Sequence, residues 1–168
     1  AQKILGNSFV MTFVMSAILV TFSMIWLDEV LIAFGGSEQT IPYAKNYLRI
    51  VIPYSIFTNL TFNFCSIMRS AGHPKNSMII IMFGAILNVI LDPIFIFWFD
   101  WGIAGAAWAT VISMFISSIF AIGHFFNKNH PVHFSRSSLK LERRIMYNIF
   151  SIGLSPFLVN TVAAGVNI

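Results

Sequence analysis

Five long runs of the chain are almost free of charged side chains, and they constrain its fold more than any other feature. The runs cover residues 4–27, 50–68, 76–99, 101–123 and 145–168, and together they hold one charged residue, Asp92. A bilayer core about 30 Å thick is crossed by about 20 apolar helical residues. Buried helices of a water-soluble protein would show charged faces, yet charged residues make up only 10% of this chain. The pattern predicts an all-α, polytopic helical membrane protein.

The runs divide the chain into four complete transmembrane helices and the start of a fifth. We expect the four helices over about residues 7–33, 43–69, 76–98 and 102–126, a connector over 127–144, and a truncated helix over 145–168. The first run is too long for a signal peptide. The chain begins at Ala1 without an initiator methionine and stops inside the fifth run, so we expect an internal fragment of a longer polypeptide.

The basic residues between the runs set the expected orientation. Residues 69–75 and the connector 127–144 carry lysine and arginine, whereas the other two connections carry aspartate and glutamate. Positive residues favour the cytoplasmic side, so the connector should be cytoplasmic. Lys45 and Arg49 are exceptions, because they lie on the outer side. We expect no nucleic-acid partner for the connector, and its His130 and His133 are more typical of solvated loop residues than of a metal site.

Asp92 is the candidate functional residue that stands out within the runs. A charged carboxylate inside a bilayer is costly, so we expect it to face protein or a water-filled cavity. Asn88 lies four residues earlier, on the same helical face. Pro93 cannot donate to the carbonyl of Val89. These groups could take up a proton or bind Na⁺, as in the broken helices of transporters. The alternative is a polar kink in which Asp92 pairs with a hydroxyl and only stabilises the bend.

Two other predicted helices carry polar residues at helical spacing. One set is Ser55, Asn59, Asn63 and Ser66, and the other is Thr110, Ser113 and Ser117. Such residues often only bond neighbouring helices, at about 0.6 kcal/mol each. Two sets beside the Asp92 helix favour one shared hydrated interior, with candidate substrate-cavity residues Asn59, Asn63, Ser113 and Ser117. The small residues of "GIAGAAWA" (102–109) indicate close helix packing.

Three segments, "MRSAGHPKNS", "NVILDPIFIF" and "WGIAGAAWATVIS", resemble the multidrug and toxic compound extrusion (MATE) transporters, in particular a staphylococcal-type branch. The resemblance covers essentially the whole chain. It implies two six-helix lobes, of which this chain would hold helices three to six, the connector and the start of helix seven. It also implies a multi-pass protein of the bacterial cytoplasmic membrane that exports cationic, amphipathic drugs in exchange for H⁺ or Na⁺, without a cofactor.

The resemblance also implies an ion site. Asn88 and Asp92 match the family's helix-five pair, and Thr110 falls where a threonine of helix six would be. A further aspartate, on helix one, lies outside this chain. Some family members use a glutamate about eight residues after a helix-seven proline, but here Ala164 follows Pro156 at that distance. That departure shifts the expected coupling role, and any bound Na⁺, to Asp92, Asn88 and Thr110.

Three alternatives stay open on the sequence. A lipid-linked oligosaccharide flippase of the same superfamily would have basic residues lining its cavity. A non-transporting membrane scaffold would give Asp92 no access to solvent. A membrane-embedded enzyme is the least favoured, because the runs hold no nucleophile–base pair and no metal-binding spacing.

Overall fold

The computed structural model describes residues 2–33, 40–126 and 142–166, and these residues are helical with no strand. The elements are α1 (Gln2–Ile25), α2 (Leu27–Ala33), α3 (Ile41–Ser70), α4 (Pro74–Pro93), the π-helical η1 (Ile94–Trp98), α5 (Gly102–His124) and α6 (Arg143–Val166). Four stretches of these described residues are long and apolar enough to cross a membrane: Lys3–Ile25, Ile41–Ser70, Pro74–Trp98 and Gly102–His124. The prediction of an all-α polytopic membrane protein is confirmed.

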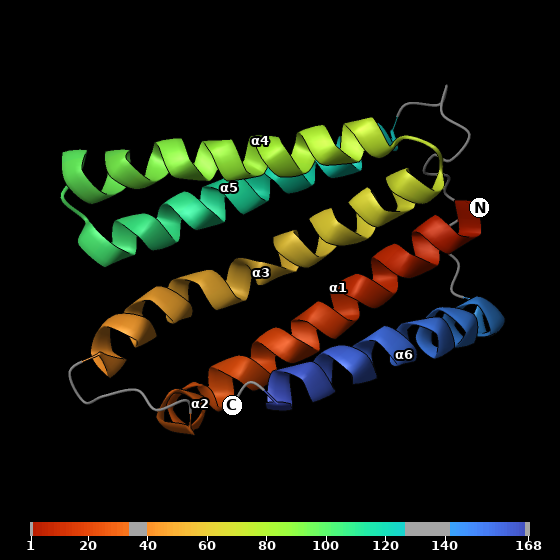
Figure 1. The fold of residues 1–168 in the computed structure, drawn as a ribbon, viewed down its shortest axis with the longest axis horizontal. Coiled ribbons are helices and arrows are strands. Elements are labelled where there is room, and N and C mark those ends of the chain that lie inside the picture. Colours follow the sequence, from red (N-terminus) through yellow and green to blue (C-terminus); the bar gives the residue numbers. More distant parts are fainter. Residues whose placement is uncertain (1, 34–39, 127–141, 167–168) are drawn as a thin grey trace.

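The long helices share one general axis, and each long helix runs opposite to the long helix before it in the chain (Figure 1). α5 packs against both α3 and α4, α1 packs along α3, and α6 contacts α1. The beginnings of α1, α4 and α6 therefore lie at the same end of the bundle as the ends of α3 and α5. We call this the inner end, because the basic residues of the sequence predict that it faces the cytoplasm.

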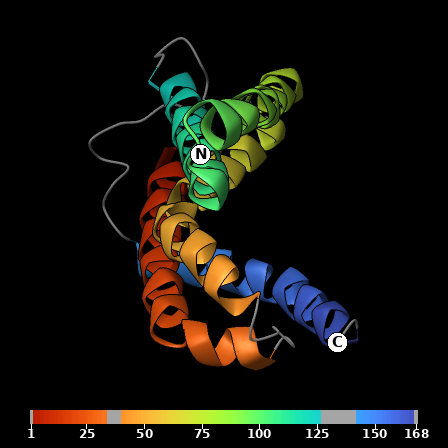
Figure 2. The same ribbon diagram turned by 90° about the vertical axis from the view of Figure 1, so that its left-hand side faces the viewer.

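The first predicted helix, 7–33, is divided in the structure. α1 ends at Ile25 and α2 begins at Leu27, and Figure 2 shows α2 turning away from the axis of α1. Asp28 and Glu29 lie in the first turn of α2, where the positive end of a helix dipole favours carboxylates. The charged residues thus begin a separate short helix instead of extending the apolar one.

The other helices differ from the expected bounds by a few residues, apart from one change of type. The stretch expected as one helix over 76–98 becomes π-helical after Pro93, where η1 begins. α6 begins at Arg143, inside the range expected for the connector. Residues 127–141 of that connector, with His130 and His133, lie outside the described residues, as does the side chain of Pro156.

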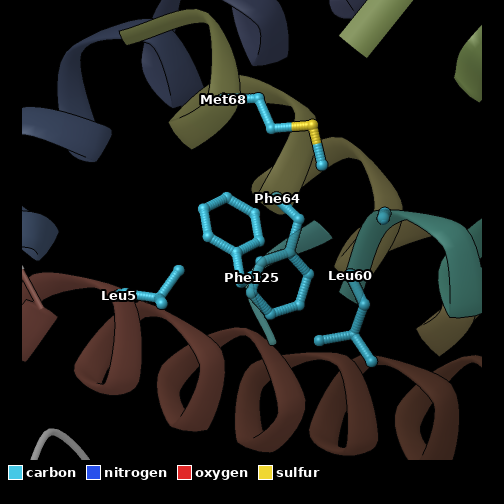
Figure 3. Close-up of a cluster of buried hydrophobic side chains, with 6 residues drawn as sticks. Leu5, Leu60, Phe64, Met68 and Phe125 are labelled. Carbon is cyan, nitrogen blue, oxygen red and sulfur yellow. The ribbon is translucent and has the colours of Figure 1, made fainter. Parts of the chain in front are cut away.

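A buried apolar cluster joins α1, α3 and α5 at the inner end. Figure 3 shows Leu5, Leu60, Phe64, Met68 and Phe125 pointing toward one another, and Ala121 completes the group. The rings of Phe64 and Phe125 lie 5.4 Å apart between centroids. Inside a bilayer, close packing of side chains rather than their removal from water holds helices together. The cluster fixes the inner ends of three helices to one another.

The outer end is held by contacts of a different kind. Lys45 Nζ donates to Asp28 Oδ2 at 2.7 Å, and this bond connects α2 to the second turn of α3. The pair gives Lys45 a counter-ion at the side of the membrane where the positive-inside pattern does not expect a lysine. Arg49 is exposed one turn further along α3.

Candidate functional site

The structure places Asp92 in the last turn of α4, directly before the change to π-helix. Pro93 lacks an N–H, so the carbonyl of Val89 loses its usual helical donor. In η1 the N–H of Phe99 donates to Ile94 O at 3.0 Å, five residues back, as a π-turn requires. Short π-helical segments are frequent beside functional sites. Asp92 thus lies at an irregular point of the helix and is half-buried.

Asn88 connects Asp92 to α5. Its Nδ2 atom lies 3.4 Å from Asp92 Oδ1 and 3.3 Å from Thr110 Oγ1. Both distances are longer than the usual 2.9–3.0 Å, so the cluster is loosely bonded. The three residues expected to form one ion site are brought together. The polar partner of Asp92 is an amide rather than the hydroxyl that a simple capped kink would supply.

Tyr47 of α3 is a fourth member of this cluster, and the sequence did not point to it. Its hydroxyl lies 3.3 Å from Thr110 Oγ1, which itself donates to the carbonyl of Ala106 at 2.9 Å. A hydroxyl has one proton and two lone pairs. Because the Thr110 proton goes to Ala106, Tyr47 and Asn88 must both donate to Thr110. The Thr110 hydroxyl therefore uses its full hydrogen-bonding capacity.

Two oxygens of the cluster keep free capacity. Within the described residues, Asp92 Oδ2 and Asn88 Oδ1 have no hydrogen-bond partner. Together with the Val89 carbonyl, they supply three acceptor oxygens within about one helical turn. Hard cations prefer oxygen ligands of these types. The arrangement can accept a proton at the carboxylate or contribute several oxygens to a bound cation.

A cavity of about 220 Å³ between α3, α4 and α5 borders this cluster at Asn88 and Thr110. A water molecule needs about 10–15 Å³ of such space, so the cavity has room for several. Thr58 Oγ1 is buried at this cavity without a partner among the described residues. Ser113 and Ser117 also line it, but their hydroxyls donate to carbonyls four residues back in α5, at 2.8 and 2.7 Å.

A second cavity, of about 670 Å³, lies between α1, α3 and α6. Asn59 donates to Ser16 Oγ and Asn63 donates to Thr12 Oγ1, each at 2.9 Å, and all four residues line the cavity. Asn63 Oδ1 is buried without a partner among the described residues. Thr12 and Ser16 are four residues apart in a charge-free run, a spacing that could have singled them out.

In the described residues the two polar sets border different cavities, and the expectation of one shared interior stays a prediction. Asn59 and Asn63 line the α1–α3–α6 cavity, whereas Ser113 and Ser117 line the α3–α4–α5 cavity, and the two cavities have no lining residue in common. The physical reason is the helical period, because Thr58 and Asn59 are consecutive and point to different sides of α3. Neither cavity is lined by lysine or arginine among the described residues.

Comparison with known proteins shows which family this chain resembles in sequence. The family model described as MatE matches residues 1–94. Multidrug export protein MepA of Staphylococcus saprophyticus is 30% identical over 147 residues, which is 88% of this chain and 33% of the relative. MepA of Staphylococcus haemolyticus is 32% identical over 146 residues, which is 87% of this chain and 32% of the relative. The chain thus spans about a third of the length of the curated relatives it matches.

Solved structures agree in fold. An inward-facing multidrug resistance MATE family transporter of the MOP superfamily matches with a TM-score of 0.86 and 24% identity, over 92% of this chain and 35% of that one. An outward-facing structure, also described as a multidrug resistance MATE family transporter of the MOP superfamily, matches with a TM-score of 0.81 and 23% identity. The match covers 98% of this chain and 39% of that one. The family match and the four candidate spans of the described residues define a multi-pass membrane protein. The chain belongs to the MatE family.

Proposed function

We propose that this chain supplies the ion-coupling part of a multidrug exporter that works by alternating access in the bacterial cytoplasmic membrane. The curated relatives are named multidrug export proteins. The observation that carries the coupling proposal is the Asn88 amide, which lies within 3.4 Å of Asp92 and 3.3 Å of Thr110 on a second helix. The exported substrates are small cationic, amphipathic drugs.

In this proposal Asp92 is the group that exchanges H⁺ or Na⁺. Its free Oδ2 takes the cation, and the amide oxygen of Asn88 is the next ligand. A change of charge at Asp92 alters its attraction for the Asn88 amide, which is also bonded to Thr110 of α5. Ion binding at α4 is therefore transmitted to α5, and the irregular π-turn after Pro93 is the place where α4 can bend.

The larger cavity supports a separate drug site. Its walls combine Met11, Met15 and Phe150 with the amides of Asn59 and Asn63. Methionine side chains adapt to ligands of different shapes. We assign drug contact to this cavity and ion contact to the cluster around Asp92, on the other side of α3.

The Asp92→Asn variant tests the coupling role, in the protein expressed from its complete reading frame and reconstituted in vesicles. Efflux of a fluorescent cation is measured under an imposed pH gradient and, separately, under a Na⁺ gradient. Wild type should respond to one of the two gradients, which identifies the coupling ion. Asp92→Asn should lose that response. Asp100→Asn is the matched control, because Asp100 is exposed and its positive φ of 55° is well tolerated by asparagine.

Efflux by Asp92→Asn at the wild-type rate, with equal protein in the membrane, would remove Asp92 from the coupling role. A flippase is not favoured, since the described cavity walls lack basic residues. A scaffold role predicts that no gradient drives efflux through the wild-type protein.

A further inference from the structure

The large cavity between α1, α3 and α6 has a polar contact on its inner side. Its walls include residues between 11 and 19 of α1 and between 149 and 154 of α6. Both helices begin at the inner end of the bundle, so they run in the same direction (Figure 1). Asn7 lies one helical turn before the α1 wall, and Glu142 lies about two turns before the α6 wall. A contact between these two residues therefore lies where the cavity would open at the inner end.

Two interactions form this contact, which we call the inner latch (Lys3, Asn7 and Glu142). The backbone N–H of Glu142 donates to Asn7 Oδ1 at 3.0 Å, and the carboxylate of Glu142 is ion-paired with Lys3. The Asn7 side chain is 1% exposed and its Nδ2 donates to the carbonyl of Lys3 at 2.8 Å, so the acceptor is fixed on α1. The carbonyl of Glu142 accepts from Ile145 and Met146 in the first turn of α6. The latch thus joins the start of α6 to the first two turns of α1.

The rest of α6 is lightly attached to the bundle. Among the described helices α6 contacts α1 alone, whereas α5 packs against both α3 and α4. The buried apolar cluster that joins α1, α3 and α5 at the inner end contains no described side chain of α6. One hydrogen bond and one exposed ion pair are weak interactions, because water competes for each of them. The start of α6 can therefore leave α1 at low cost while α1, α3 and α5 stay packed together.

We propose that the inner latch is the inner gate of the large cavity. While the latch is closed, α1 and α6 are joined at the inner end and the cavity is shut on that side. When the latch breaks, the start of α6 moves away from Asn7, and the cavity opens between the two helices. The inference rests on the proposed drug site in this cavity, because an exporter must admit its substrate from the cytoplasm. It adds the three residues whose separation admits that substrate.

Access to the cavity can be measured by thiol labelling. Gly153 lines the cavity and nothing lies within 4 Å of a Cβ built there, so Gly153→Cys adds a reporter without displacing a neighbour. The protein is expressed from its complete reading frame in everted vesicles, and a membrane-impermeant charged maleimide is added. Ser70→Cys is the matched control, because Ser70 is exposed where α3 ends, at the inner end. Cys65 is buried, and the protein without a reporter gives the background rate.

Reversing one charge should open the latch, because Lys3→Glu places a second carboxylate beside that of Glu142. Labelling of Gly153→Cys should then become about fivefold faster, which is the ratio that corresponds to one surface ion pair. Asn7→Ala removes the acceptor of the Glu142 N–H and should have an effect of similar size. Exchanging the two charges, by combining Lys3→Glu with Glu142→Lys, should return labelling to the wild-type rate. Labelling of Ser70→Cys should be the same in all these proteins.

The gate is overturned if Lys3→Glu leaves the labelling of Gly153→Cys unchanged, or if the charge exchange labels as fast as Lys3→Glu alone. Equal acceleration at Ser70→Cys would also overturn it, because that result reports a general loosening of the inner end. The side chains of Lys3 and Glu142 are 60% and 41% exposed, so both charge variants are compatible with folding. Labelling needs no transport. Absence of gradient-driven efflux in the wild type would therefore overturn the exporter proposal separately from the gate.

Discussion

The backbone N–H of Glu142 donates to the side-chain oxygen of Asn7 at 3.0 Å, across 135 residues of sequence. Asn7 is 1% exposed, and its Nδ2 donates in turn to Lys3 O at 2.8 Å. Glu142 immediately precedes α6, and its carbonyl accepts from Ile145 and Met146. One buried amide therefore connects the first turns of α1 to the start of the helix that follows the connector.

We expect Asn7→Ala to lower the free energy of unfolding by about 1–3 kcal/mol, because it removes a buried amide and takes the acceptor away from the part-buried N–H of Glu142. Lys3→Ala removes only the ion pair with Glu142, whose side chains are 60% and 41% exposed, and should cost less than about 1 kcal/mol. Unfolding in mild detergent measures both. Equal costs for the two variants would show that the buried amide has no special role.

The Thr110 hydroxyl should be needed for cation binding and not only for helix packing. Thr110→Val keeps the shape of the side chain but leaves Tyr47 and Asn88 without their shared acceptor. We expect the cation concentration for half-maximal efflux to rise about tenfold, while Thr110→Ser stays near wild type. The measurement is drug efflux as a function of the coupling cation. Normal cation dependence in Thr110→Val would exclude the threonine as a co-ligand.

Two glycines hold the helix carrying Asp92 close to α5, and their replacements should behave differently. A Cβ at Gly84 would lie 2.3 Å from Ser117 Oγ, a side-chain atom, whereas a Cβ at Gly105 would lie 2.6 Å from the backbone oxygen of Phe95. Each alanine variant should lose about 1–3 kcal/mol of stability through overpacking. Adding Ser117→Ala should restore most of the loss for Gly84→Ala.

The same second substitution should give no rescue of Gly105→Ala, because the obstacle there is main chain. Comparing the melting temperatures of the single and double variants gives a double-mutant cycle that measures the rescue. Rescue of both glycine variants by Ser117→Ala, or of neither, would contradict the packing described for α4, η1 and α5.

The separation of the two cavities predicts different effects on drug transport. Asn63→Ala removes an amide that lines the larger cavity and should change efflux of a cationic drug by about tenfold, because a buried polar contact is lost. Ser113→Ala removes a hydroxyl that is bonded to its own helix. Efflux of the same drug by this variant should stay within about twofold of the wild-type value. Drug-concentration curves at a fixed ion gradient distinguish the two. A larger effect from Ser113→Ala would reverse the assignment of the cavities.

The helical period was sufficient to predict one contact of the cluster around Asp92. Asn88 and Asp92 are four residues apart on one helix, so their proximity follows from local geometry. Thr110 was placed by family resemblance, and the structure brings it to 3.3 Å from Asn88. Tyr47 was missed because an aromatic residue near the outer end of a transmembrane helix usually marks the membrane interface. Its contact spans 63 residues, and no local pattern encodes it.

Tertiary packing also decided what the sequence could not. The charge-free runs located the long helices, but the division at Trp26 and the π-turn after Pro93 are changes of direction and winding inside apolar sequence. Asn59 and Asn63 do line one cavity together, and Thr110, Ser113 and Ser117 line another. Which cavity each face borders depends on how α3 is rotated between α1 and α5, where Phe64 of α3 packs on Phe125.

The saturated hydroxyl of Thr110 has a consequence for how tightly an ion can be held. A cation that reaches this oxygen must first displace the phenol of Tyr47 or the amide of Asn88, so each binding event costs a bond that the empty protein already possesses. Such competition keeps net affinity modest. A carrier needs a modest affinity, because an ion that could not leave on the far side of the membrane would stop transport after one cycle.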